Sequence, residues 1–385
     1  MTVASLEETG PVFVDRKRHL WLLGLVVPAL PFIAAGLVRV TGLGLMWWFG
    51  PLFVYGVIPF CELAIGLDRD NPPESAVPAL EADRFYRRCV YAFIPLQYVS
   101  FVWGAWMVAH GGLGWLSALG LTVTVGVMNG IGINTAHELG HKREETERLL
   151  AKITLAPVAY GHFYVEHNRG HRVRVATPED PASSRFGESF YRFWPRTVAG
   201  SFRSAWDIEQ TRLARMNRGP WSWQSDIVQA FALTALVSGA LLAAFGPVMI
   251  PFLVIQAVVG FSELEVVNYL EHYGLLRQKT ADGRYERATP AHSWNSNQLV
   301  TNVFLYQLQR HSDHHAHPTR RYQALRHFEE SPQLPSGYAS MIVLALVPPL
   351  WRRVMDWRVR AHYGGDLGLA NIHPALRERV LAAAA

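Results

Sequence analysis

The chain has 385 residues, of which half are apolar and only 17% are charged, against about a quarter in typical soluble domains. The net charge is only +5, which disfavours a nucleic-acid-binding protein, so we expect no nucleic-acid partner. Cys61 and Cys89 are the only cysteines, which excludes a disulfide scaffold, a four-thiolate metal site and an iron–sulfur cluster within this chain.

Long uncharged windows predict six membrane-spanning helices, because a bilayer core of about 30 Å needs about 20 apolar residues of helix. Two windows lie on either side of Arg39, and a third, from Cys89 to His137, is long enough for a helical hairpin. Gly246 and Pro247 interrupt helices, and they mark the turn of a second hairpin. The predicted spans are about 19–40, 44–66, 89–110, 113–137, 226–245 and 247–264.

The distribution of Lys and Arg predicts the orientation of these spans. If the N-terminal segment is cytoplasmic, Arg39 is the only basic residue on the outer side, and this asymmetry follows the positive-inside rule. Both termini are then cytoplasmic, and residues 138–225 and 265–385 form a cytoplasmic cap, with 336–351 lying along the membrane interface. The predicted fold is an all-α integral membrane protein with six transmembrane helices and a histidine-rich helical cap, in one catalytic domain, 1–385.

Four histidine-rich motifs lie on this predicted cytoplasmic side. They read HELGH from His137, EHNRGH from Glu166, NYLEH from Asn268 and HSDHH from His311. Residues four apart share a helix face, so each pair at that spacing can approach one metal ion. A zinc ion takes about four ligands, so eight imidazoles fit two metals better than one. The eight candidate ligands are His137, His141, His167, His171, His272, His311, His314 and His315.

Imidazole ligands leave iron, copper and zinc open as the metal. Acidic or amide neighbours could accept the outer ring proton of a ligand and orient it; these candidates are Glu138, Asn268, Glu271 and Asp313. We interpret His162, His292, His317 and His327 as ordinary polar residues.

Two other functions use some of these residues. An intramembrane zinc protease would use His137, Glu138 and His141, but it leaves the other three motifs without a role. A metal transporter would normally place its site near the membrane midplane, whereas these histidines lie at span ends and in the cap.

The segments HELGHK, EHNRGH, NYLEHYGL and LQRHSDHHA, with RVRVATPEDPASSR, resemble the AlkB family of bacterial membrane alkane monooxygenases. The resemblance implies an inner-membrane enzyme with two non-haem iron ions, which hydroxylates the terminal carbon of medium-chain n-alkanes with O₂ to give 1-alkanols. It also implies electrons from rubredoxin, supplied by a rubredoxin reductase. Membrane fatty-acid desaturases and hydroxylases are more distant relatives and an alternative function.

Arg172 departs from the family pattern, in which the second motif ends in two histidines. A guanidinium stays protonated and cannot bind a metal. Three interpretations stay open: water fills the gap, His162 or His317 substitutes, or one metal site is weakened.

An alkane has no polar group, so we expect it to enter between the spans and lie in an apolar channel that ends at the histidines. Aromatic residues of the second span could line this channel or simply pack; they are Trp47, Trp48, Phe49, Phe53 and Tyr55. The basic residues Arg320, Arg321 and Arg326 could attract an acidic electron carrier or contact anionic lipid.

Overall fold

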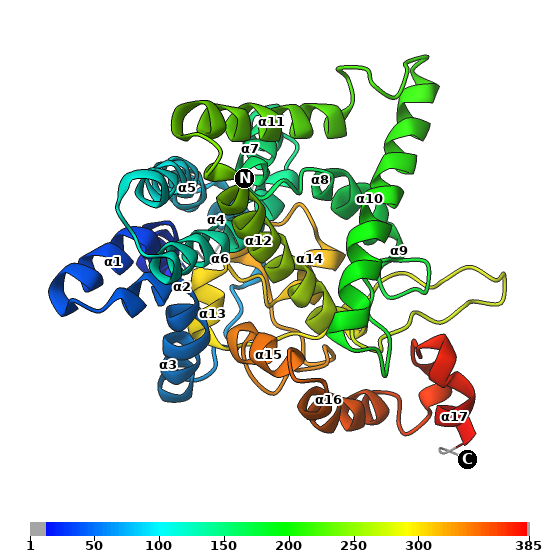
Figure 1. The fold of residues 1–385 in the computed structure, drawn as a ribbon. Helices are drawn as coiled ribbons and strands as arrows, with labels where there is room; N and C mark the ends of the chain where they lie inside the picture. Colours follow the sequence, from blue (N-terminus) through cyan, green and yellow to red (C-terminus); the bar gives the residue numbers. More distant parts are fainter. Residues whose placement is uncertain (1–12, 383–385) are drawn as a thin grey trace, which may run out of the picture.

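The computed structural model describes residues 13–382, and its regular elements are all helical apart from isolated β-bridges. Six helical segments are long and apolar enough to cross a membrane, as predicted, and they form the left and centre of Figure 1. In chain order they are Arg18–Thr41 (η1, Arg18–Leu25, and α1, Val26–Thr41), Gly44–Ile65, α5 (Arg84–His110), α6 (Trp115–Gly140), α11 (Asp226–Phe245) and α12 (Met249–His272).

Two spans are longer than predicted. α5 begins at Arg84 rather than near residue 89, and α12 continues to His272 rather than ending near 264. The prediction ended each span at a charged residue, but a formed helix extends at little cost. Within α12 the charged residue Glu265 is satisfied by hydrogen bonds from Tyr160 and Thr197, both at 2.8 Å. The protein therefore carries two of its spans beyond the apolar windows into the polar side.

α6 is the central helix of the bundle. Of its most apolar window, 72% is buried, against 17% to 39% in the other spans. Its close approach to α12 depends on glycine, because a Cβ atom at Gly126 would lie 2.7 Å from Cβ of Val259. Small residues commonly permit such helix contacts in membranes.

A chain of buried amides connects three spans. Nε2 of Gln97 on α5 donates to Oδ1 of Asn129 on α6 at 3.0 Å, and Nδ2 of Asn129 donates to Oε1 of Gln256 on α12 at 2.9 Å. All three side chains are fully buried. Since an unpaired amide is costly in an apolar interior, this chain of bonds fixes the register of the spans beside the site described below.

The second span is irregular and loosely packed, with only 22% of its most apolar window buried. A π-helical turn, η3, interrupts it, and π-helical turns occur often at functional sites. Pro51 and Pro59 lie on either side of this turn and lack the N–H that a regular helix needs. Its four parts are η2 (Gly44–Trp48), α2 (Phe49–Leu52), η3 (Phe53–Val57) and α3 (Ile58–Ile65).

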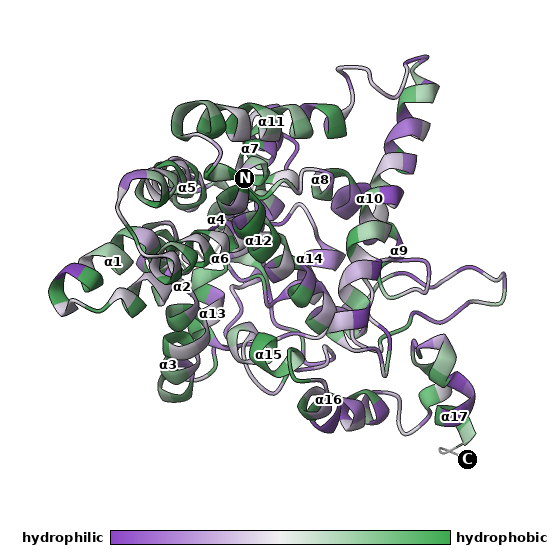
Figure 2. Ribbon diagram, in the orientation of Figure 1, coloured by the Kyte–Doolittle hydropathy of each residue, from purple (hydrophilic) through white to green (hydrophobic). Residues whose placement is uncertain are grey.

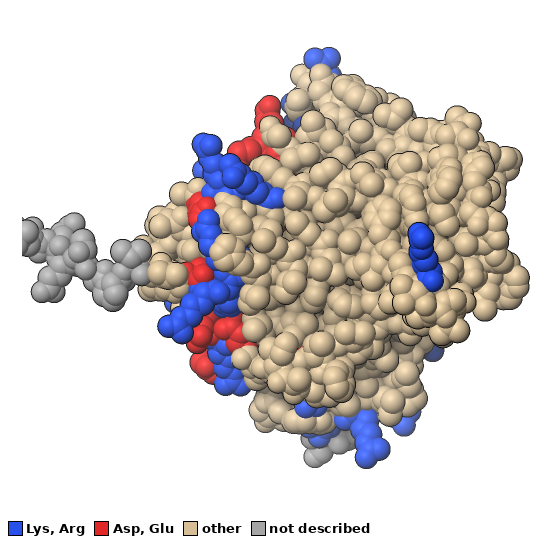
Figure 3. Space-filling model, turned by 90° about the vertical axis from the view of Figure 1, so that its left-hand side faces the viewer, with Lys and Arg blue, Asp and Glu red and all other residues tan. Residues whose placement is uncertain are grey.

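The remaining helices are of both kinds: some are mainly hydrophilic, and others, such as α15 (Tyr338–Ala345), are apolar. Figure 2 shows hydrophobic residues along the spans and hydrophilic residues on α10, which runs across the direction of α11. Figure 3 shows a broad face with few charged side chains, and most of the visible charges lie along its left-hand edge. These helices are α4 (Val77–Ala82), α7 (Glu145–Leu155), α8 (Phe163–Val165), α9 (Arg172–Arg174), α10 (Phe190–Arg215), α13 (Leu299–Phe304), α14 (His311–Ala316), α15 (Tyr338–Ala345), α16 (Pro348–His362) and α17 (Arg377–Ala382).

The segment predicted to lie along the interface divides into two parts. α15 is mostly buried, including Tyr338, Met341 and Ala345, and it packs against α12. Exposed apolar residues follow at Leu346, Val347 and Leu350, so only this second part has the exposure expected of an interfacial segment. The cytoplasmic position of the termini stays a prediction, and residues 1–12 and 383–385 lie outside the described residues.

Candidate metal centre

Four separate elements bring the eight predicted ligands together. His137 and His141 lie one turn apart at the end of α6, and their ring centroids are 4.8 Å apart. The other histidines lie on a π-helical turn, at the end of α12 and on α14; these are His167 and His171 on η6 (Glu166–His171), His272, and His311, His314 and His315.

The eight side chains divide into two groups of four, and the ligand atoms within each group lie within 4.8 Å of one another. The division does not follow the sequence motifs, because η6 and α14 each supply histidines to both groups. The first group contains His137, His141, His167 and His314, and the second contains His171, His272, His311 and His315.

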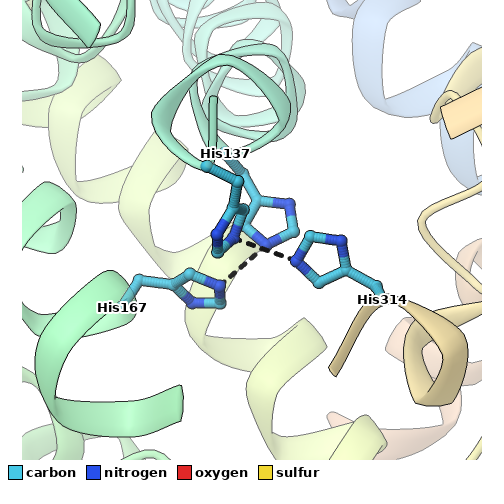
Figure 4. A group of neighbouring side chains, drawn as sticks. His137, His167 and His314 are labelled. Atoms are coloured by element: carbon cyan, nitrogen blue, oxygen red, sulfur yellow. Dashed lines mark hydrogen bonds between the residues drawn. The ribbon is translucent and has the colours of Figure 1, made fainter. Parts of the chain in front are cut away.

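The spacing of the ring nitrogens fits a shared metal ion. Nε2 of His137 lies 2.8 Å from Nε2 of His167, and Nε2 of His314 lies 2.9 Å from Nε2 of His141 (Figure 4). Two nitrogens about 2.1 Å from one metal ion are separated by about 3.0 Å at a right angle and about 3.4 Å at the tetrahedral angle. In the second group, Nε2 of His315 lies 2.8 Å from Nε2 of His311.

The surroundings keep three of these imidazoles neutral. Burial, followed by the charges of neighbouring histidines, holds the pKa of His167, His314 and His315 well below the usual range. A neutral imidazole offers a lone pair to a metal ion. The donor set therefore fits two metal ions with about four imidazoles each.

A mainly apolar cavity leads away from the two groups. His137, His167 and His311 line one end. Along α6 the lining continues back to Gly130, seven residues or about 10 Å from His137. From the second span, Val54 and Ile58 line the cavity. The five aromatic candidates are not among its lining residues; Trp47, for example, packs against Trp103 at 6.4 Å between ring centroids.

Comparison with known proteins agrees with this geometry. A family model described as fatty acid desaturase matches residues 113–345. The chain is 48% identical to alkane 1-monooxygenase of Acinetobacter baylyi, covering 96% of this chain and 91% of that protein. It is also 46% identical to alkane 1-monooxygenase of Ectopseudomonas oleovorans, covering 97% and 93%, and 47% identical to alkane 1-monooxygenase 1 of Alcanivorax borkumensis, covering 95% and 91%.

The chain belongs to the alkane 1-monooxygenase family. This membership confirms the resemblance inferred from the histidine motifs, and it identifies the protein as a multi-pass membrane enzyme. The match to the desaturase model covers α6, α12 and α14, which carry most of the histidines. The matched range therefore includes all eight candidate ligands.

In this member of the alkane 1-monooxygenase family, Glu138 contacts a lysine rather than a histidine. Nζ of Lys142 lies 3.0 Å from Oε1 of Glu138, and the backbone N–H of Tyr322 donates to the same oxygen at 3.4 Å. This carboxylate is therefore not free to act as the general base that a zinc protease would need. Its position instead ties the end of α6 to the chain at Tyr322.

The other three predicted neighbours differ in what they contact. Oε2 of Glu271 lies 3.1 Å from Nε2 of His311, and its other oxygen accepts from the hydroxyl of Tyr338 at 2.8 Å. Asn268 donates to Glu265 at 3.2 Å. The contacts of Asp313 are to Arg320 and His317, at 2.8 Å each.

One partner of the histidines is missing from the predicted set. Oδ2 of Asp180 lies 2.9 Å from Nδ1 of His171 and accepts from Oγ of Ser183 at 2.6 Å. Asp180 follows His171 by nine residues, so no helical spacing indicates the contact. Its only signal in the sequence is its place in the family-like segment RVRVATPEDPASSR.

Arg172 lies at the solvent-exposed side of the centre. After burial and neighbouring charges, its own charge also lowers the pKa of His141 and His315. Neither proposed substitute joins the two groups. His162 packs against the ring of Tyr160 at 4.3 Å, and His317 has a side chain that is 52% exposed. The arrangement therefore favours eight imidazoles with the ninth position occupied by Arg172.

Proposed function

We propose that the protein hydroxylates the terminal carbon of medium-chain n-alkanes with O₂ to give 1-alkanols, using two iron ions and electrons from rubredoxin. The observation that carries this proposal is the pair of four-histidine groups at the end of an apolar cavity. We propose iron because the reaction needs a redox-active metal, which excludes zinc.

Bound iron would supply the activation of O₂ and the oxidising power that cleaves the C–H bond, which no side chain provides. The chain supplies position and environment. The eight histidines hold the metals, and Asp180 orients the His171 ring through Nδ1. The apolar lining from Val54, Ile58 and Ile131 excludes water and aligns an unbranched chain with its methyl end toward the histidines.

The surface nearest the metals is suited to an electron donor. His315 is the least buried of the eight histidines, and His317 follows it by two residues. The exposed Arg172 is followed by Val173, which is 66% exposed. We propose that rubredoxin docks over this apolar and cationic surface, since electron transfer requires a short path to the metals.

The three arginines that the sequence suggests for attracting an acidic electron carrier each form an ion pair with a carboxylate of this chain. Arg320 pairs with Asp313 at 2.8 Å, Arg321 with Glu147 at 3.1 Å and Arg326 with Glu74 at 2.7 Å. Their charges therefore stabilise the histidine-bearing side internally, and they attract an acidic protein less than free arginines would. We also propose that this side faces the cytoplasm of a bacterial inner membrane, in accordance with the positive-inside rule.

Metal analysis of the purified protein, together with a reconstituted assay, tests the proposal. Inductively coupled plasma mass spectrometry should find about two irons per chain, and rubredoxin, rubredoxin reductase and NADH should support conversion of n-decane to 1-decanol. A single zinc bound through His137 and His141, without O₂-dependent product, would contradict it.

A further inference from the structure

An acidic residue, Glu263, lies in the wall of the apolar cavity, within the membrane-spanning part of the protein, and a tyrosine behind the wall holds it. The hydroxyl of Tyr55, on the π-helical turn η3, donates to Oε1 of Glu263 on α12. Both side chains are half-buried, and Glu263 lines the cavity. An ionisable residue in a membrane span is costly and usually functional.

Tyr55 is the only hydrogen-bonding partner of the Glu263 carboxyl group within residues 13–382, and no Lys or Arg of that range forms an ion pair with it. Its second oxygen, Oε2, therefore keeps the capacity to accept a hydrogen bond. By contrast, Glu265, two residues later, accepts from Tyr160, Thr197 and Asn268. The proposed alkane reaction gives the free oxygen of Glu263 no role.

Residue counts along α12 and α6 show that Glu263 lies about two helical turns away from the metal centre. It precedes Glu271, the residue in contact with His311, by eight residues on α12, or about 12 Å of helix. On α6, its side chain packs beside Gly130, where an added Cβ atom would lie 2.7 Å from Cγ of Glu263. Gly130 precedes His137 by seven residues, or about 10 Å. Glu263 and the histidines thus lie at separate levels of the same cavity.

We infer that Glu263, positioned by Tyr55, forms a subsite for the hydroxyl end of a primary alkanol, whose opposite methyl end is presented to the histidines. An extended chain advances about 1.2 Å per bond, so 12 Å corresponds to about ten bonds. An alkanol of about ten carbons spans this distance. A fatty-acid anion fits poorly, because it would bring a second carboxylate beside Glu263 in an apolar wall.

This inference rests on the proposed function and extends it to a second substrate class. The terminal C–H bond of the alkanol breaks and a C–O bond forms, giving an α,ω-diol. One oxygen atom of O₂ enters the product and the other leaves as water, with two electrons from the same donor and two protons. The reacting centre is the same as for an alkane, and only the recognition of the far end differs.

Competition between 1-decanol and n-decane in one reconstituted reaction tests the subsite. Mass spectrometry quantifies the 1-decanol formed from decane and the 1,10-decanediol formed from the added 1-decanol. Isotopic labelling of the decane separates the products of the two substrates. Glu263→Leu should lower the ratio of alkanol to alkane turnover about fivefold, as expected for the loss of one hydrogen bond. Glu263→Gln keeps an acceptor oxygen and should largely preserve the ratio. Tyr55→Phe, which removes only a hydroxyl, should lower it by a smaller factor and serves if the leucine variant fails to accumulate.

1-Methoxydecane is the matched control substrate, because it lacks the hydroxyl donor. Its turnover relative to decane should be the same in the native protein and in Glu263→Leu. An equal loss of alkanol and alkane turnover, or an unchanged ratio in Glu263→Leu and Tyr55→Phe, would overturn the subsite. Absence of decane hydroxylation by the native protein would instead overturn the proposed function.

Discussion

Oδ2 of Asp180 lies 2.9 Å from Nδ1 of His171, and both side chains are almost completely buried. A carboxylate at this nitrogen fixes the ring orientation and leaves Nε2 to face the other histidines of the second group. Nε2 of His171 has no hydrogen-bonding partner among the described residues, as expected of an atom that faces a metal position.

Asp180→Asn should weaken metal binding at the second group by about 10- to 100-fold, because loss of the carboxylate lowers the basicity of the ligand. Metal content after dialysis against a graded series of chelator concentrations measures this change. Asp282→Asn, in an exposed turn, is the control and should retain the native content. Equal retention in both variants would show that Asp180 does not support a ligand.

Arg172→His should make the iron harder to remove with a chelator, since the imidazole adds a donor in place of a guanidinium whose charge lowers the pKa of His141 and His315. Arg172→Gln removes the charge without adding a ligand and separates the two effects. If glutamine raises occupancy as much as histidine, repulsion by the guanidinium explains the difference. If neither variant changes the retention of iron against chelator, position 172 is not a ligand site.

Val54→Phe should shift the preferred alkane toward shorter chains, because Val54 lines the cavity from the second span. Turnover of the longest accepted alkane should fall roughly tenfold, the order of effect seen when a packed apolar site is overfilled. A series of n-alkanes assayed singly gives the chain-length profile. Val57→Phe, on the same turn but 42% exposed, is the control, and an identical shift in both variants would contradict a filter at Val54.

Asn129→Leu should lower the free energy of unfolding by about 1 to 2 kcal/mol, because it removes two interhelical hydrogen bonds. Detergent-induced unfolding followed by tryptophan fluorescence measures the change. Leucine at all three amide positions, 97, 129 and 256, should recover part of the loss, since no buried amide is then left unpaired. Native stability in the single variant would show that these bonds do not hold the spans together.

The sequence alone determined the six spans, the family and the eight histidines as candidate ligands, because these depend on local features. Uncharged windows mark helices that suit a bilayer, and a spacing of four residues puts His137 and His141 on one face whatever surrounds them.

Only the tertiary structure decided which histidines share a metal position and what surrounds them. His314 lies beside His141, which precedes it by 173 residues, while its neighbour His315 belongs to the other group. Asp180 approaches His171 through a loop without helical periodicity, and Tyr55 meets Glu263 across 208 residues. Such contacts depend on how α6, α12, α14 and the second span pack together, because interactions between distant segments have no period along the chain.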